Sequence, residues 1–130
     1  MSTFPTLLMV NAFIGTAGYK KLYLELGYSV VSEWSERKAI SLIRKAPPVV
    51  IVADFYHQSD FRDRLSNLES LLATAQASPG TKILVFYEPA HQSVLDAVRT
   101  RLRIDAALTL PVQEDLLRTT LQTWLAGKPE

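Results

Sequence analysis

The segment Pro48-Val49-Val50-Ile51-Val52-Ala53-Asp54 decides the fold, because it joins an unbroken apolar run to a terminal carboxylate. A strand with apolar side chains at every position is buried on both faces, which is typical of a parallel sheet covered by helices. The segment Ile83-Leu84-Val85-Phe86 has the same composition. Both segments therefore predict central strands of a parallel sheet.

Three further strand-like segments and five helix-like segments alternate with these two along the chain. The predicted strands cover residues 6–11, 28–33, 48–54, 81–87 and 105–109. The predicted helices cover residues 18–26, 35–46, about 59–76, about 94–102, and a stretch after Pro111 that includes 117–125. Strict alternation of strands and helices indicates a doubly wound α/β fold. We expect a flavodoxin-like five-stranded parallel sheet of order 2-1-3-4-5, in three α/β/α layers.

The helix predicted over residues 35–46 has signals at both ends. Ser35 is a side chain that commonly caps a helix N-terminus. Pro47 and Pro48 end the helix, because proline disfavours helical backbone before it and offers no N–H. The local sequence thus predicts both ends of the helix that connects the second and third predicted strands.

Length and composition bound the class of protein. The chain has 130 residues, which fits one domain over 1–130 with a core from about 6 to 125. It has no cysteine, a net charge of +1 and apolar runs of strand length. We therefore expect a cytoplasmic protein without disulfides, metal or cofactor, binding neither nucleic acid nor membrane.

The stretch from residue 27 to Asp54 resembles the second strand, second helix and third strand of response-regulator receiver domains. The stretch 108–112, Leu-Thr-Leu-Pro-Val, resembles the end of the receiver's fifth strand. The likeness extends over about residues 6–125. It implies a signalling domain in which an aspartate after the third strand accepts a phosphoryl group, and Asp54 matches that aspartate.

Other positions of the receiver's phosphorylation site differ in this chain. The acidic pair that binds magnesium in the family corresponds to Asn11 and Ala12, and the lysine before the proline corresponds to Leu110. Magnesium prefers carboxylate oxygens, and a transferred phosphoryl group needs cations around it. We therefore predict that Asp54 is a vestigial phosphoacceptor.

The receiver's two switch positions are also changed. The hydroxyl of the fourth strand corresponds to Tyr87 or, with a shift of one residue, to Glu88, and the aromatic residue of the fifth strand corresponds to Ala107. The family uses its fourth helix, fifth strand and fifth helix as an output face. This likeness implies a partner face containing Ala107, Leu110 and Trp124, which could bind another protein or a second copy of the chain.

Aromatic side chains gather near the expected site. Tyr19, Tyr23 and Tyr28 lie near the first predicted helix, and Phe55 and Tyr56 follow the aspartate. They could close a vestigial pocket or anchor a partner. Both interpretations stay open from the sequence.

An alternative function is the binding of a small ligand or phosphate. Residues 15–18, Gly-Thr-Ala-Gly, open the first predicted helix, where free N–H groups can bind phosphate next to the Asp54 edge. An enzyme is disfavoured, because the sequence shows no set of nucleophile, base and orienting group.

Overall fold

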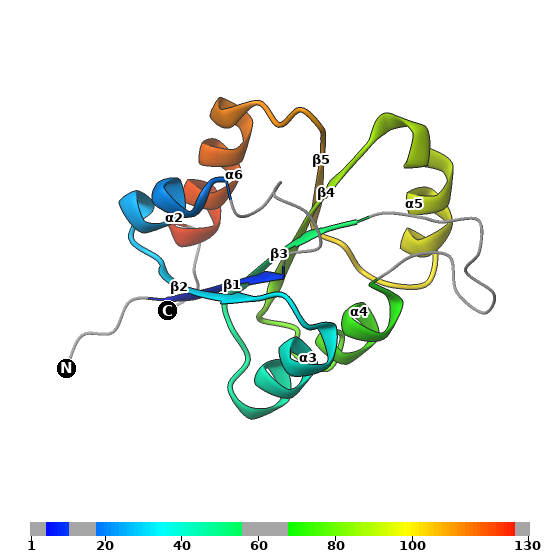
Figure 1. Ribbon diagram of the computed structural model, residues 1–130, viewed down its shortest axis with the longest axis horizontal. Coiled ribbons are helices and arrows are strands. Elements are labelled where there is room, and N and C mark those ends of the chain that lie inside the picture. The colour runs from blue at the N-terminus through cyan, green and yellow to red at the C-terminus, as the bar shows by residue number, and fades with distance from the viewer. Residues whose placement is uncertain (1–4, 11–17, 56–67, 127–130) are drawn as a thin grey trace.

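The computed structural model describes residues 5–10, 18–55 and 68–126 (Figure 1). Five parallel strands form one sheet in the order β2-β1-β3-β4-β5, which confirms the predicted topology. The strands are β1 (Thr6–Val10), β2 (Ser29–Glu33), β3 (Val50–Asp54), β4 (Lys82–Tyr87) and β5 (Ala106–Thr109).

Helices cover both faces of this sheet, which confirms the three-layer architecture (Figure 1). The helices are α2 (Lys20–Leu26), α3 (Glu36–Lys45), α4 (Glu69–Ala75), α5 (Gln92–Arg99) and α6 (Glu114–Ala126), with a short 3-10 helix η1 (Pro89–His91). α2 and α6 lie on one face, and α3, α4 and α5 lie on the other. The first part of the helix predicted from about residue 59 lies outside the described residues.

The core has two halves, one on each face of the sheet. Val50 and Val52 pack with α2 and α6, whereas Ile51 and Ala53 pack with α3, α4 and α5. Every residue of β3 is buried, as its continuous apolar sequence predicts. Because side chains alternate along a strand, Asp54 lies on the α2 and α6 face.

Two local signals of the sequence have the expected effect. The Ser35 hydroxyl accepts a hydrogen bond from the Lys38 backbone N–H at 3.2 Å and caps α3, which ends before the two prolines. Gly27 ends α2 with a φ of 106°, a left-handed conformation that glycine adopts without steric cost. Its turn directs the chain into Tyr28 and β2.

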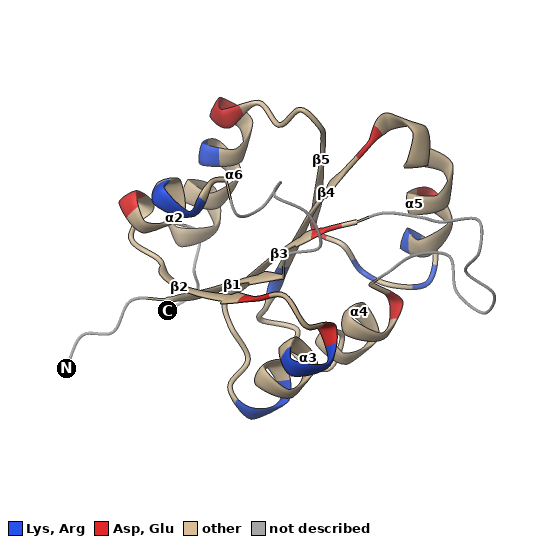
Figure 2. Cartoon of the chain, in the orientation of Figure 1, with Lys and Arg blue, Asp and Glu red and all other residues tan. Residues whose placement is uncertain are grey.

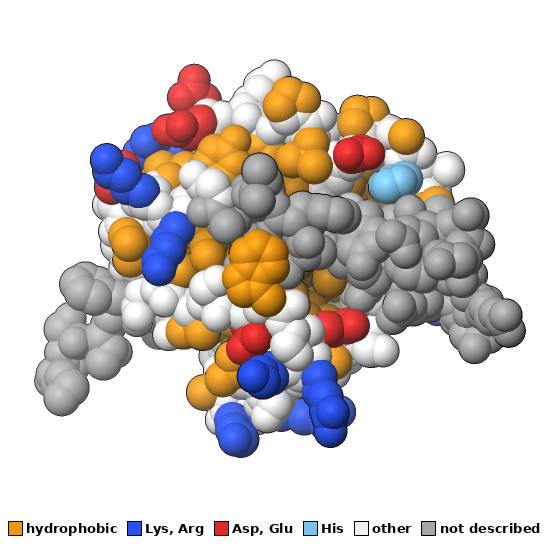
Figure 3. Space-filling model, in the orientation of Figure 1, with side chains coloured by type: hydrophobic (Ala, Val, Ile, Leu, Met, Phe, Trp, Pro, Cys, Tyr) orange, Lys and Arg blue, Asp and Glu red, His pale blue; other side chains and the backbone are white. Residues whose placement is uncertain are grey.

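The surface carries both signs of charge, and acidic and basic residues lie on helices of both faces (Figure 2). Hydrophobic side chains also reach the surface between charged groups (Figure 3). The most exposed large ones are Leu24, Val31, Trp34, Leu42 and Leu116. Within the described residues, no helix combines the length and the apolar character needed to cross a bilayer.

Candidate functional site

Asp54 is the last residue of β3 and lies at the carboxyl edge of the sheet, where open α/β sheets bind ligands. Only 2% of its surface is exposed. It pairs in register with Phe86 of β4, and the next backbone N–H, from Phe55, donates to the Phe86 carbonyl at 2.8 Å. The strand pairing therefore continues past the carboxylate and holds it against an aromatic neighbour.

Tyr23 of α2 lies in the half of the core that Asp54 faces. Its side chain is completely buried in the same half of the core as Phe86. Burial of the phenol raises the pKa of Tyr23, and the negative charges of Asp54 and then Tyr19 raise it further. Burial and the charge of Asp54 therefore both favour the neutral form of the Tyr23 phenol.

Tyr19 completes the aromatic surroundings of Asp54. Its ring meets Phe86 edge to face, with ring centroids 5.9 Å apart and an interplanar angle of 83°. Its hydroxyl donates to the Val112 carbonyl at 3.4 Å. Tyr19 thus links α2 to the segment after β5, and this end of the core is closed by aromatic packing.

Leu110 lies beside the end of β4, as the resemblance to receivers predicts for the lysine position. Its backbone N–H donates to the Tyr87 carbonyl at 2.8 Å, and the Leu110–Pro111 peptide bond is cis. The half-buried leucine side chain packs against the α2 and α6 half of the core. This position supplies an apolar surface, with no positive charge.

Tyr87 and Glu88, the two residues that could correspond to the family's hydroxyl, differ in their surroundings. Tyr87 is the last residue of β4 and is buried among α3, α4 and α5, on the sheet face opposite Asp54. Its hydroxyl donates to the Gln92 side-chain carbonyl of α5. Glu88 follows the strand and is exposed. β4 therefore ends with a tyrosine whose hydroxyl is bound to α5, and Glu88 lies beyond the strand.

The residues of the expected partner face are spread over both sides of β5. Ala107 packs against the α3, α4 and α5 half of the core, whereas Leu110 and Trp124 pack against the other half. Trp124 also lines a cavity at the opposite edge of the sheet from Asp54.

Several predicted site residues lie outside the described residues. These are Asn11, Ala12, residues 15–17 of the glycine loop, and Tyr56. Gly18, the last residue of that loop, is described and is exposed before α2.

The electrostatic effect of Asp54 on the pKa of Tyr23 was not predicted from the sequence. Tyr19 and Tyr23 are four residues apart, which places both on one face of a helix. This spacing is the sequence signal that could have linked the two tyrosines. Tyr28 has a separate role, because its hydroxyl donates to the Leu121 carbonyl of α6 at 2.8 Å.

The sequence matches no protein-family model and no curated protein. Solved receiver domains match its structure over nearly the whole chain. One is the signal receiver domain described for a Luxo repressor protein of Vibrio parahaemolyticus, with a TM-score of 0.73 and 19% identity over 97% of this chain and 93% of that one. Another belongs to an HD domain-containing protein of Pseudomonas fluorescens Pf-5, with a TM-score of 0.78 and 15% identity over 98% and 91%.

A third match is the receiver domain of a sensor histidine kinase from Pseudomonas aeruginosa PAO1. It has a TM-score of 0.71 and 18% identity over 95% of this chain and 99% of that one. That structure holds a magnesium ion in its active site cleft. The present chain therefore has the fold of response-regulator receiver domains, and the resemblance seen in the sequence is confirmed at the level of fold.

Proposed function

We propose that this chain is a receiver-like signalling module that acts by binding another protein and is not phosphorylated at Asp54. The observation that carries this proposal is the burial of Asp54, which is 2% exposed at the end of β3 and pairs in register with the buried Phe86. An attacking carboxylate must reach the phosphorus of a donor in line with the leaving group. The aromatic packing on the described side leaves the carboxylate little access to such a donor.

The charge around Asp54 supports the same proposal. The Pseudomonas aeruginosa receiver coordinates magnesium in its cleft. In this chain the positions that resemble the family's acidic pair offer the amide of Asn11 and the methyl of Ala12. Among the described residues, no group of three or more His, Cys, Asp or Glu side chains could hold a metal ion. With Leu110 in place of a lysine, an incoming phosphoryl group meets repulsion from Asp54 with little compensation.

The partner would bind to the face formed by α5, β5 and α6, which corresponds to the output face of receivers. Leu116 of α6 exposes 51% of its surface, so this side chain is available to a partner. A second copy of the chain or a different protein could provide that surface. On this proposal the chain is not an enzyme, and its output does not depend on phosphoryl transfer.

Beryllofluoride, which mimics a phosphoryl group, tests the proposal. Amide spectra of the wild-type chain and of Asp54→Asn are recorded with magnesium, before and after beryllofluoride is added. The Pseudomonas aeruginosa receiver serves as a positive control. We expect unchanged spectra for both forms of this chain. Shifts in the wild-type chain that disappear in Asp54→Asn would refute the proposal.

A further inference from the structure

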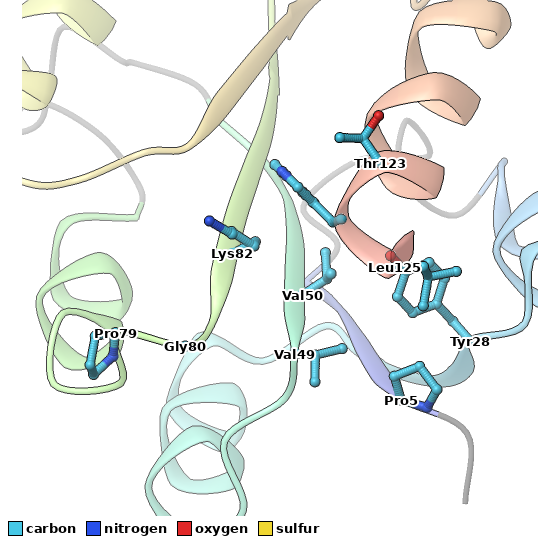
Figure 4. A pocket seen from close by; sticks show the side chains of 10 residues that line it. Pro5, Tyr28, Val49, Val50, Pro79, Gly80, Lys82, Thr123 and Leu125 are labelled. Carbon is cyan, nitrogen blue, oxygen red and sulfur yellow. The ribbon is translucent and has the colours of Figure 1, made fainter. Parts of the chain in front are cut away.

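A cavity of about 500 Å³ lies at the amino edge of the sheet, opposite the edge that holds Asp54. Its floor includes Val49 and Val50 at the start of β3 and Lys82 at the start of β4. The last turns of α6, which carry Thr123 and Leu125, form a wall (Figure 4). Trp124 of the same helix also lines the cavity. This volume lies within the range of cavities that bind small molecules.

The sequence of β4 explains why the cavity exists. Phe86 and Leu84 fill the space between the sheet and the helices on the α2 and α6 face. Lys82 is the next residue on that face, since it pairs with Val50, but its side chain is exposed. A lysine extends its ammonium group toward water, so it does not fill the core as a third apolar side chain would. The space below the end of α6 is consequently empty of core side chains.

The lining of the cavity combines an apolar surface with one charged group. Among the described residues that line it, Lys82 is the only charged one. In the part of the chain that the structure describes, no carboxylate forms an ion pair with Lys82. Pro5, Tyr28 and Leu125 gather on one side in Figure 4, and Lys82 stands apart from them near Gly80. The hydroxyl of Tyr28 is already bound to α6, so this residue offers the cavity mainly its ring.

We propose that this cavity binds a small anion with an aromatic body, such as an aryl carboxylate or sulfonate. The aromatic body would lie against Trp124 and the aliphatic lining, and the anionic group would pair with the Lys82 ammonium. Burial of an apolar body supplies affinity, and a single charged contact orients the ligand. This inference is independent of the proposed function, because the cavity and Asp54 lie at opposite edges of the sheet.

Anilinonaphthalene sulfonate is a probe of this class, and N-phenyl-1-naphthylamine is its uncharged counterpart. The titrations use a Trp34→Phe background, which leaves Trp124 as the one tryptophan of the chain. Trp34 is 59% exposed, so this change leaves the core intact. Binding in the cavity should quench Trp124 emission in a saturable manner, with one probe per chain.

Two variants separate the charge of the cavity from its volume. We expect Lys82→Met to weaken binding of the sulfonate about tenfold, as loss of a charge-assisted contact predicts, and to leave the uncharged probe unaffected. Gly80→Leu should weaken both probes, because a side chain there extends into open space beside the cavity and the backbone needs no glycine. Lys45→Met, which removes an exposed charge from α3 on the other face, should change neither affinity.

Circular dichroism before each titration ensures that only folded variants are compared. Equal sulfonate affinity in the background protein, Lys82→Met and Gly80→Leu would overturn the inference. Failure of the sulfonate to quench Trp124 in the background protein would overturn it as well.

Discussion

The two edges of the sheet differ in how their side chains fill the space between strands and helices. At the carboxyl edge, Asp54 is buried at the end of β3, where it pairs in register with Phe86. At the amino edge, Lys82 leaves a cavity below α6. Open α/β sheets usually bind ligands at the carboxyl edge. The fold therefore determines at which edge of the sheet a site can lie, whereas a few side chains determine whether the space between sheet and helices at that edge is open.

The largest expected difference in stability is between two alanine variants on the same face of β4, one at each end of the strand. Phe86→Ala should lower the free energy of unfolding by about 3–5 kcal/mol, because it leaves a void in a fully buried aromatic cluster. Lys82→Ala should change it by less than about 0.5 kcal/mol, since its side chain fills no core space. Urea unfolding of both variants measures the difference. Similar losses at both ends would remove the contrast between the two edges.

Alkaline pH should distinguish the two edges through their tyrosines. Burial raises the pKa of Tyr28 from its ordinary 10.0 to about 12, and the pKa of Tyr23 is raised by more. Unfolded phenols ionise near pH 10, whereas these folded ones stay protonated. The contribution of these two tyrosines to stability is therefore constant below pH 10 and falls as the pH rises toward 12, because unfolding then releases protons.

Replacement of each tyrosine by phenylalanine assigns this fall to its source. Tyr23→Phe should remove the larger part of the alkaline loss, and Tyr28→Phe the smaller part. Tyr28→Phe should also cost about 1 kcal/mol at neutral pH, because the hydrogen bond to the Leu121 carbonyl is lost. Urea titrations between pH 8 and 12 provide the test. An unchanged pH profile in Tyr23→Phe would show that its phenol is not buried beside Asp54.

The smallest effect on stability is expected on α6, which connects the two edges along the α2 and α6 face. Leu116→Ser should alter the free energy of unfolding by less than about 0.5 kcal/mol, because the side chain is exposed. It should nevertheless weaken self-association, or binding of an identified partner, measured by light scattering or titration calorimetry. Full binding by this variant would move the proposed interaction away from the α5, β5 and α6 face.

The strand order and the position of Asp54 could be predicted from sequence because they depend on local composition. An unbroken apolar run before Asp54 requires burial on both faces, whatever surrounds it. The burial of Tyr23 in the core half that Asp54 faces could not be predicted in this way, because it depends on how α2 packs on the sheet. The sequence leaves open whether Tyr87 or Glu88 corresponds to the family's hydroxyl, since a shift of one residue moves a side chain to the other face of a strand.

The cavity was missed for a related reason. Lys82 is locally an ordinary lysine at the start of a strand, and its pairing with Val50 shows that it occupies a core-facing position. Trp124 is half-buried, packs against the α2 and α6 half of the core and lines the cavity, a position that its helical spacing alone does not give. The surroundings of Lys82 and Trp124 depend on packing between segments far apart in the chain, which cannot be derived from a single sequence.

Acetyl phosphate tests the central claim, that Asp54 does not accept a phosphoryl group, most directly. The wild-type chain and Asp54→Asn are incubated with acetyl phosphate and magnesium, alongside the Pseudomonas aeruginosa receiver, and their intact masses are measured. We predict that neither form of this chain gains the mass of a phosphoryl group. A phosphoryl adduct on the wild-type chain that is absent from Asp54→Asn would contradict the account.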